Sequence, residues 1–462
     1  MDTAIARAKR GRPPDFSAVR GRRLLIALSG GADSVALACL LAEARAREAL
    51  TLFAAHLDHG IRPESAGDAE ACRALCARLD IPFHTVRLDV PAEAARAGEG
   101  LESCARRLRY GWLQQVKDAV RADYIALAHH MDDQAETVLM HLARGTGPEG
   151  IGGMRTFAGD LYRPLLGVRK AWLTAYLAGR GIPWREDRTN VVADNPRNAL
   201  RLDGIPALER AYPGFVPAAA RYAHAAQIES DYIQEQTDVY IREHVVRLPS
   251  GTYFGLFPEL HPAILRRALR AFAGERLDWA HLNAAAELAE RPRGRASLAG
   301  GLSIERGRAG LYLLHNRPKS VEVPLRLGGD TALDGLCTLT ASPCAPAPVR
   351  DDPMRQALDP EALRNAVVRT RRPGDRIRPL GCGEKLLSDY LTDRRIDRPL
   401  RDCLALVARD NRVLWVCGVG ISEDAKLCPG AREALALCCD YAFDLRRLLP
   451  GFSAQVAQAA QE

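Results

Sequence analysis

Short apolar runs alternate with amphipathic segments along the first part of the chain, from Leu24 to Ala178. Short apolar runs between polar turns predict buried strands, whereas apolar residues spaced three and four apart predict helices. The predicted strands are 24–28, 51–57, 83–90 and 124–128, and the predicted helices are 35–41, 64–79, 102–120, a segment ending at 142, and 170–178. Strands and helices that alternate in this way form a parallel sheet covered on both faces, so we predict an α/β fold.

The pattern changes after this region. Residues 188–206 are polar and predict irregular structure, and Pro213-Gly214 stops a short predicted helix. A long helix is predicted at 217–247 and two more at 262–273 and 278–290, so we expect an all-helical middle piece. After Pro318, segments such as VEVPLRLGG and CTLTAS predict short strands, and a small α/β piece follows. The predicted segments are a basic tail at 1–22, an α/β domain at 23–206, a helical domain at 207–317, a strand-rich linker region at 318–364 and a last domain at 365–462.

Composition limits the compartment and the partners. The first 23 residues contain seven Lys or Arg and no apolar core, which predicts a mobile tail rather than a signal peptide. No apolar run approaches the roughly 20 residues that span a bilayer. The net charge of +7 permits a nucleic-acid partner without proving one. Twelve cysteines without a C-x-x-C pair suit free thiols, so we expect a cytoplasmic protein with no membrane contact.

The turn after the first predicted strand carries the clearest chemistry. Its sequence, Ser29-Gly30-Gly31-Ala32-Asp33-Ser34, joins a strand directly to a helix. Two glycines allow a sharp turn, and the N–H groups of the turn and of the new helix then face outward with the helix dipole behind them. The turn therefore predicts a phosphate site, although it matches neither the GxxxxGK(S/T) loop nor the GxGxxG loop.

Polar clusters follow two more of the predicted strands, at His56-Leu57-Asp58-His59 and at residues 129–136, HHMDDQAE. The carboxyl ends of parallel strands meet at one edge of a sheet, so these clusters and the turn predict one shared site. Their His and carboxylate groups suit a metal cage, helix caps, or a magnesium ion escorted by phosphate, and we favour the magnesium alternative over the cage.

Two carboxylates, Asp133 and Glu136, are three residues apart at the start of a predicted helix, so both share one face of its first turn. Together they can hold an amine. The alternative is a D-x-x-E capping box, in which Asp132 or Asp133 caps the helix.

Taken together, these stretches resemble the tRNA(Ile)-lysidine synthetase family of ATP pyrophosphatase-loop enzymes. Eight motifs of that family occur here in order, at Ser29–Ser34, His56–Arg62, Glu102–Tyr110, His129–Thr137, Arg144–Gly147, Arg163–Leu166, Asp187–Asn190 and Arg197–Arg201. A C-terminal motif matches at Arg369, Arg372–Arg376, Gly381, Lys385 and Leu386. The chain departs from the family where Ile396-Asp397 replaces the usual Ile-Pro.

The resemblance implies an N-terminal domain of the Rossmann-like adenine nucleotide α-hydrolase type at 23–206, a substrate-binding domain at 207–317 and a tRNA-binding domain at 365–462. It also implies a reaction in two steps. ATP adenylates O2 of the wobble cytidine in tRNA(Ile) with a CAU anticodon and releases pyrophosphate. The lysine amine then displaces AMP, and the resulting lysidine changes codon reading from AUG to AUA.

The resemblance and the residue chemistry together give a set of expected site residues. The catalytic set is Asp33, Arg109, Asp133 and Glu136; the nucleotide is held by Ser29, Gly30, Gly31, Ala32, Asp33, Ser34, His56 and Asp58; lysine is held by Asp133 and Glu136; and tRNA is held by Arg201, Arg371, Arg372 and Arg376. Arg109 is expected to offset phosphate charge, with Arg201 as a second candidate. The expected cofactors are ATP and Mg²⁺, with Asp33 near the metal. The expected partners are tRNA(Ile) and L-lysine, and homodimerisation is left open.

Two other functions compete with this interpretation. A cytidine 2-thiolase also adenylates its base, but it needs a cysteine pair or an iron–sulfur cluster, and the missing C-x-x-C disfavours it. A non-catalytic RNA-binding protein would not need Asp33, Asp133 and Glu136, which are all present.

Arginines are dense in two later segments. Residues 265–310 contain nine Arg against five acidic residues, and residues 365–402 contain nine Arg and Lys385 against six. RNA helices are recognised through phosphates and shape, so we predict that these two segments bind the tRNA.

Overall fold

The computed structural model describes residues 13–58, 65–185, 196–274, 277–315, 321–346, 352–428 and 430–449. The chain forms two compact units, Met1–Tyr232 and Ile233–Glu462, which are described separately. Among the described residues, no helix is long and apolar enough to cross a membrane.

The first unit is built around a six-stranded sheet with the order β3-β2-β1-β4-β6-β5, in which only β5 is antiparallel to its neighbour. Its strands are β1 (Arg23–Ala27), β2 (Thr51–Asp58), β3 (Phe83–Arg87), β4 (Tyr124–Ala126), β5 (Phe157–Ala158) and β6 (Leu161–Tyr162). Its helices are α2 (Ala32–Ala44), α3 (Ser65–Arg78), α4 (Val90–Ala97), α5 (Leu101–Ala119), α6 (Met131–Ala143), α7 (Pro148–Ile151), α8 (Lys170–Ala178), α9 (Pro196–Ala199) and α10 (Ile205–Ala211), followed by α11 (Phe215–His244). The predicted parallel α/β fold is confirmed.

The alternation of side chains along β1 explains the two covered faces. Leu24 and Ile26 are fully buried in a cluster with residues of α2 and α8, whereas Leu25 is buried in a second cluster with Leu113 and Val116 of α5. Successive side chains of a strand point to opposite faces, so one apolar run fills both layers. The order of the strands reverses at β1, because β2 and β3 are added on one side of β1 and β4 is added on the other side. Ligands of such sheets bind beyond the strand ends at this point.

Two predictions for the first unit need correction. The predicted mobile tail includes residues 13–22, but Phe16 and Val19 are buried against the β1 core. Residues 1–12 lie outside the described residues. The segment predicted to be irregular is helical where it is described. It contains α9, a π-helical turn at Leu200–Gly204 and the start of α10. Ile205 and the first turns of α11 pack against α6, so tertiary contacts stabilise these short helices.

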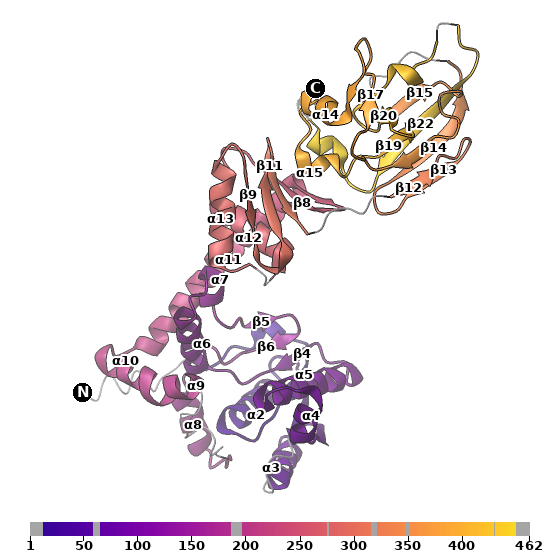
Figure 1. Cartoon of the computed structure of the whole chain (residues 1–462). Helices are drawn as coiled ribbons and strands as arrows, with labels where there is room; N and C mark the ends of the chain where they lie inside the picture. Colours follow the sequence, from indigo (N-terminus) through magenta and orange to yellow (C-terminus); the bar gives the residue numbers. More distant parts are fainter. Residues whose placement is uncertain are drawn as a thin grey trace. The chain divides into compact units, whose positions relative to one another are not determined.

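The second unit begins with a mixed fold, so the predicted all-helical middle piece is wrong. Helices α12 (Pro262–Ala273) and α13 (Trp279–Glu290) occur as predicted, but they cover a five-stranded antiparallel sheet (Figure 1). Its strands are β7 (Val245–Leu248), β8 (Gly251–Gly255), β9 (Gly294–Ser297), β10 (Ser303–Arg306) and β11 (Gly310–Leu314). Each strand has at most five residues and many are bounded by glycine, so the sequence gives little alternation to detect.

The rest of the second unit contains two sheets. One has the order β12-β16-β19-β20-β17-β18 with β21 added on β20, and the other has the order β13-β14-β22-β15. The strands are β12 (Glu322–Pro324), β13 (Asp330–Leu333), β14 (Cys337–Cys344), β15 (Arg355–Leu358), β16 (Val367–Arg369), β17 (Arg376–Ile377), β18 (Lys385–Leu386), β19 (Leu406–Arg409), β20 (Arg412–Val416), β21 (Gly420–Ile421) and β22 (Ala434–Tyr441), and the helices are α14 (Leu387–Asp393) and α15 (Arg398–Arg401). The strand-rich segment at 318–364 is thus part of the same sheets as the last segment.

Asp397, which stands where the family usually has proline, has a structural role. Its carboxylate accepts hydrogen bonds from the Arg308 N–H at 3.1 Å and from the Tyr312 hydroxyl at 3.1 Å. Asp397 also precedes α15, whose Pro399 stands in the first turn. A proline at position 397 could make neither side-chain contact, so the replacement ties α15 to the β11 sheet.

Arg369, the first arginine of the C-terminal motif, is structural. Its guanidinium is fully buried and donates to both carboxylate oxygens of Asp375, at 2.8 and 2.9 Å. It also donates to the carbonyls of Thr370 and Asp410. All of these hydrogen bonds are made within the protein, to residues of the loop after β16 and of the turn after β19. Arg369 therefore holds the loop between β16 and β17 in place.

Replacing Asp375 by Ala is therefore expected to lower the free energy of unfolding by about 3–5 kcal/mol, since it leaves the buried guanidinium without its counter-charge. Urea unfolding of the full chain measures this loss. Glu361→Ala is the matched control, because it breaks an ion pair with Arg364 that is largely exposed and worth about 0–1 kcal/mol. Equal losses in the two variants would contradict a structural role for the buried pair.

Candidate active site and RNA-binding surface

The predicted phosphate turn lies between β1 and α2. Gly30 has a φ of +89°, and a side chain on it would meet the Cys72 sulfur at 3.3 Å. A residue with a Cβ is strained at this φ, so glycine is needed to send the chain from the strand into the helix.

Ser34 fixes the shape of this turn. Its Oγ accepts hydrogen bonds from the N–H groups of Ser29 and Gly30 at 3.1 and 3.2 Å, and it donates to the Gly31 carbonyl at 3.0 Å. Those two N–H groups are thus used inside the turn. The N–H groups of the first turn of α2 have no intrahelical acceptor and are the ones left to face an anion.

Asp33 stands in that first turn, between two positive groups. Its Oδ2 lies 3.6 Å from His130 Nε2 and 3.9 Å from Lys170 Nζ. Its Oδ1 is buried and has no hydrogen-bond partner. Burial opposes the charge on His130, but hydrogen bonding to Asp33 and the nearby Asp133 outweigh it and raise the pKa of His130.

His130 also caps α6, which corrects the predicted capping box. The His130 ring accepts the Asp133 N–H at 3.2 Å, and the Asp133 carboxylate accepts the His130 N–H at 3.0 Å. Asp133 is therefore the third residue of the helix and not its cap. Asp132 instead accepts from Arg169 Nε and from the N–H of Lys170 at the start of α8.

The carboxylates of Asp133 and Glu136 do lie together, and two arginines already occupy them. Arg197 Nε and Arg201 Nε donate to Glu136 at 2.7 and 2.6 Å, and both arginines reach Asp133 Oδ1 at 3.2 and 3.1 Å. Glu136 is 1% exposed. Burial tends to raise the pKa of Asp133, but His130 and Arg197 outweigh it and lower that pKa. Arg201, predicted to bind tRNA, is thus held inside this charge cluster.

The second polar cluster lies at the end of β2. His56 is buried and its Nδ1 lies 2.8 Å from the Leu28 carbonyl, just before the phosphate turn. Asp58 is buried and lies 3.6 Å from Arg87 of β3. His59 and the motif at 187–190 lie outside the described residues. No three His, Cys, Asp or Glu side chains in the described part group as a metal cage.

Three arginines, Arg109, Arg163 and Arg197, are close enough to His129, which follows β4, to act on its charge. Burial is the main cause that lowers the pKa of His129 to about 4, and Arg163, Arg197 and Arg109 lower it further against the effect of Asp133. Arg109 lies over the Tyr110 ring at 5.5 Å, and burial lowers its pKa. The motifs of the resemblance contain Arg163 and Arg197, but sequence reasoning gave neither a role, because their partners are distant in the chain.

The low pKa of His129 predicts a pH dependence of stability. The folded state keeps the imidazole neutral down to about pH 4, whereas the unfolded chain protonates it near pH 6.5. The contribution of His129 to stability is therefore present above pH 6.5 and is lost as the pH drops toward 4, by about 1.5 kcal/mol between pH 6.5 and 5. Urea unfolding at pH 7 and 5 measures this, and His129→Gln should show the smaller fall. An equal fall in the variant would exclude His129 as its source.

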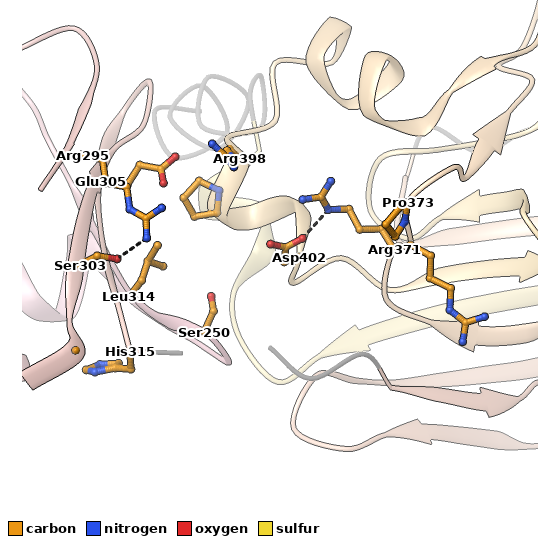
Figure 2. A pocket seen from close by; sticks show the side chains of 13 residues that line it. Ser250, Arg295, Ser303, Glu305, Leu314, His315, Arg371, Pro373, Arg398 and Asp402 are labelled. Atoms are coloured by element: carbon orange, nitrogen blue, oxygen red, sulfur yellow. Dashed lines mark hydrogen bonds and ion pairs between the residues drawn. The ribbon is translucent and has the colours of Figure 1, made fainter. Parts of the chain in front are cut away.

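Two of the predicted RNA-binding arginines of the C-terminal motif, Arg371 and Arg372, line a cleft of about 590 Å³ in the second unit, whereas Arg376 is not among the residues that line it (Figure 2). The residues that line it include Arg295, Arg371, Arg372 and Arg398 together with His315, against Glu305 and Asp402. Arg371 pairs with Asp402 at 2.6 Å, Arg372 with Glu322 at 2.7 Å and Arg376 with Glu384 at 3.0 Å. All three pairs are partly exposed, so a phosphate can compete for each guanidinium.

Comparisons with known proteins match the N-terminal and the C-terminal region of the chain to two protein families. The PP-loop domain family matches residues 7–208, and the TilS substrate C-terminal domain family matches residues 366–436. A tRNA(Ile)-lysidine synthase of Thermus thermophilus is 36% identical over 408 residues, which cover 86% of this chain and 69% of the relative. The enzyme of the same name from Geobacter sulfurreducens is 33% identical over 441 residues, which cover 89% and 92%.

A solved structure of a U34-tRNA thiolase from Methanococcus maripaludis, which carries a 4Fe-4S cluster, is also similar. It shares 19% identity at a TM-score of 0.40, over 49% of this chain and 80% of that protein. This likeness is too low to support an argument about function.

Proposed function

Since the chain belongs to the tRNA(Ile)-lysidine synthase family of ATP-dependent, tRNA-modifying ligases, we propose that it joins L-lysine to C2 of the wobble cytidine of tRNA(Ile) with a CAU anticodon. The proposed route adenylates O2 of the cytidine and releases pyrophosphate. The lysine ε-amine then attacks C2, the C2–O2 bond breaks, AMP leaves with O2, and the amine gives up a proton.

The main support for this proposal is that one side chain, His130, contacts both the phosphate turn and the carboxylate pair. His130 lies 3.6 Å from Asp33 in the phosphate turn and 3.3 Å from Asp133 in the carboxylate pair. The group that faces ATP and the group that faces the amine are thus joined through one buried side chain. A reaction in which ATP activates an oxygen of the cytosine ring and an amine then attacks that ring needs the ATP site and the amine site within reach of the same nucleobase.

The phosphate turn suits ATP with Mg²⁺. Asp33 Oδ1 is a buried oxygen without a hydrogen-bond partner, and Mg²⁺ favours a single carboxylate together with phosphates and water. Asp33 would hold the ion, which when bound offsets the negative charge of the phosphates. The N–H groups at the start of α2 offset the same charge, and Arg109 is proposed to contribute.

Asp133 and Glu136 are proposed to hold the lysine amine. The lowered pKa of Asp133 makes it a weak base, so this carboxylate suits binding of a charged ammonium better than removal of its proton. The amine must also displace Arg197 and Arg201 from the pair, and the arginines are then free to contact phosphate.

The direct test combines the full chain with ATP, isotopically labelled lysine and a tRNA(Ile) transcript. The proposal expects pyrophosphate release that depends on tRNA, and labelled lysine joined to the RNA. A transcript with the wobble cytidine replaced by uridine is the matched control. Release without any lysine in the RNA would contradict the proposal, and so would no release at all.

The thiolase alternative finds no support among the cysteines near the turn. Burial raises the pKa of Cys72 to about 12 and that of Cys76 to about 11, and it also raises that of Cys39. A sulfur carrier reacts as a thiolate, so these three buried thiols are poorly suited to that chemistry.

We also propose that Arg371 and Arg372 of the C-terminal cleft, together with Arg376 of the same motif, bind tRNA phosphates. Replacing Arg371, Arg372 and Arg376 by Gln together should lower the salt slope of tRNA binding by about one unit for each lost contact. Filter binding from about 50 to 200 mM salt measures the slope. Arg364→Gln removes an exposed arginine of the same unit and is the control. An unchanged slope in the triple variant would place the tRNA elsewhere.

A further inference from the structure

Arg163 is a buried cation without a counter-charge. Its side chain follows β6, is 8% exposed, and donates to the Arg155 carbonyl at 3.1 Å, while its Nε has no partner. No carboxylate of the described chain pairs with it, although Tyr110 contributes a hydrogen bond. Arg369, the other arginine that is buried among the described residues, also has an Nε without a hydrogen-bond partner, but its charge is paired with the carboxylate of Asp375 at 2.8 Å.

Two more arginines lie near Arg163, around the Tyr110 ring, and have no carboxylate partner among the described residues. They are Arg106 and Arg109, which lie over the Tyr110 ring at 5.1 and 5.5 Å. The Nδ1 atom of the nearby His129 is buried without a partner. We call Arg106, Arg109, Arg163 and His129 the arginine cluster. The three guanidinium groups carry like charge, and His129 beside them is neutral because its pKa is lowered to about 4. Like charges gathered in a partly buried place are costly, so the cluster is organised for an anion that the described chain does not supply.

The place of the cluster in the sheet narrows the choice of anion. The phosphate turn follows β1, whereas His129 follows β4 and Arg163 follows β6, the next strands away from β2. In the strand order, Arg163 and the helix N-terminus that suits ATP phosphates therefore lie on opposite sides of β4, and His129 follows β4 itself, next to His130. Asp133 is close enough to His129 to act on its charge. A cation-binding pair and an anion-binding cluster thus stand side by side.

We propose that the arginine cluster binds the carboxylate of the amino-acid substrate, with Arg163 as its buried anchor. This inference rests on the proposed function. Lysine would then be held at both ends, its ε-ammonium by Asp133 and Glu136 and its carboxylate by Arg163 and Arg109. Two-ended binding selects a free amino acid over amines that lack the carboxylate. It also gives the cluster, including Arg109, an anion other than ATP phosphate to bind. The KM values for lysine and for ATP in the Arg163 variants distinguish the lysine carboxylate from ATP phosphate.

The test compares L-lysine with L-lysinamide, which keeps both amines and loses the carboxylate charge. The wild-type chain should use lysine about 10- to 100-fold better, as expected for charge-assisted hydrogen bonds to a buried group. Arg163→Gln should raise the KM for lysine and bring the lysine-to-lysinamide ratio of kcat/KM close to one, and Arg163→Lys should restore part of it. Arg155→Gln is the matched control, because that guanidinium pairs with Asp231 outside the cluster, and it should keep the wild-type ratio.

A merely structural role for Arg163 would lower both reactions equally and leave the ratio unchanged, which would overturn the inference. A raised KM for ATP, or weaker tRNA binding, with an unchanged ratio would assign the anion to phosphate and overturn it as well. If the wild-type chain joins neither compound to RNA, the proposed function fails first, and that outcome is seen before any variant is made.

Discussion

Replacing Asp33 by Asn is expected to lower tRNA-dependent pyrophosphate release by about 10²- to 10³-fold, while tRNA binding stays within about twofold. Asn keeps the size of the side chain and removes its charge. The Oδ1 that has no partner in the protein then presents a weaker ligand to Mg²⁺, and His130 and Lys170 lose their counter-charge.

Single-turnover release of pyrophosphate and filter binding of the same transcript measure the two effects. Asp118→Asn is a suitable control, because Asp118 is an exposed carboxylate of α5 in the same unit that pairs with Lys117 and accepts from Gln114. A variant at position 33 that releases pyrophosphate at the normal rate would exclude Asp33 from the phosphate site. Loss of tRNA binding in parallel would point instead to a disturbed fold.

The phosphate turn could be predicted because its determinants are local. A buried strand, two glycines and an apolar helix follow one another directly, and Gly30 adopts the positive φ that such a turn needs. The parallel sheet followed for the same reason, since each strand and its helix are neighbours in sequence.

The partners of the carboxylate pair could not be predicted, because they are set by packing. Arg197 and Arg201 lie more than 60 positions from Asp133 and Glu136 in sequence, and they reach the pair only because α10 and α11 pack against α6. A capping role for His130 is also invisible in the sequence, since Asp, Ser, Thr and Asn are the usual caps. The five-stranded sheet was missed because its strands are short and because α12 and α13 lie between β8 and β9 in the sequence.

Glu136 provides the second large effect. In Glu136→Gln, adenylation is expected to stay within about threefold of the wild type, whereas lysine transfer should fall about 100-fold or more, so adenylated tRNA accumulates. The amide keeps a hydrogen-bond acceptor for Arg197 and Arg201 but loses the charge that would hold an ammonium. Glu136→Ala should in addition lower the free energy of unfolding by about 3–5 kcal/mol, because it leaves two partly buried arginines facing a void.

The two variants separate binding of lysine from support of the fold. Rapid-quench measurement of pyrophosphate and of labelled lysine in the RNA follows the two steps, and urea unfolding follows the fold. Glu229→Gln removes an exposed carboxylate from α11 of the same unit and should leave all three measurements unchanged. If Glu136→Gln slows both steps equally, Glu136 acts only by holding Arg197 and Arg201 in place. If only lysine transfer falls, the Glu136 carboxylate binds the incoming ammonium group. Lysine must then displace Arg197 and Arg201 from Glu136 before it can react.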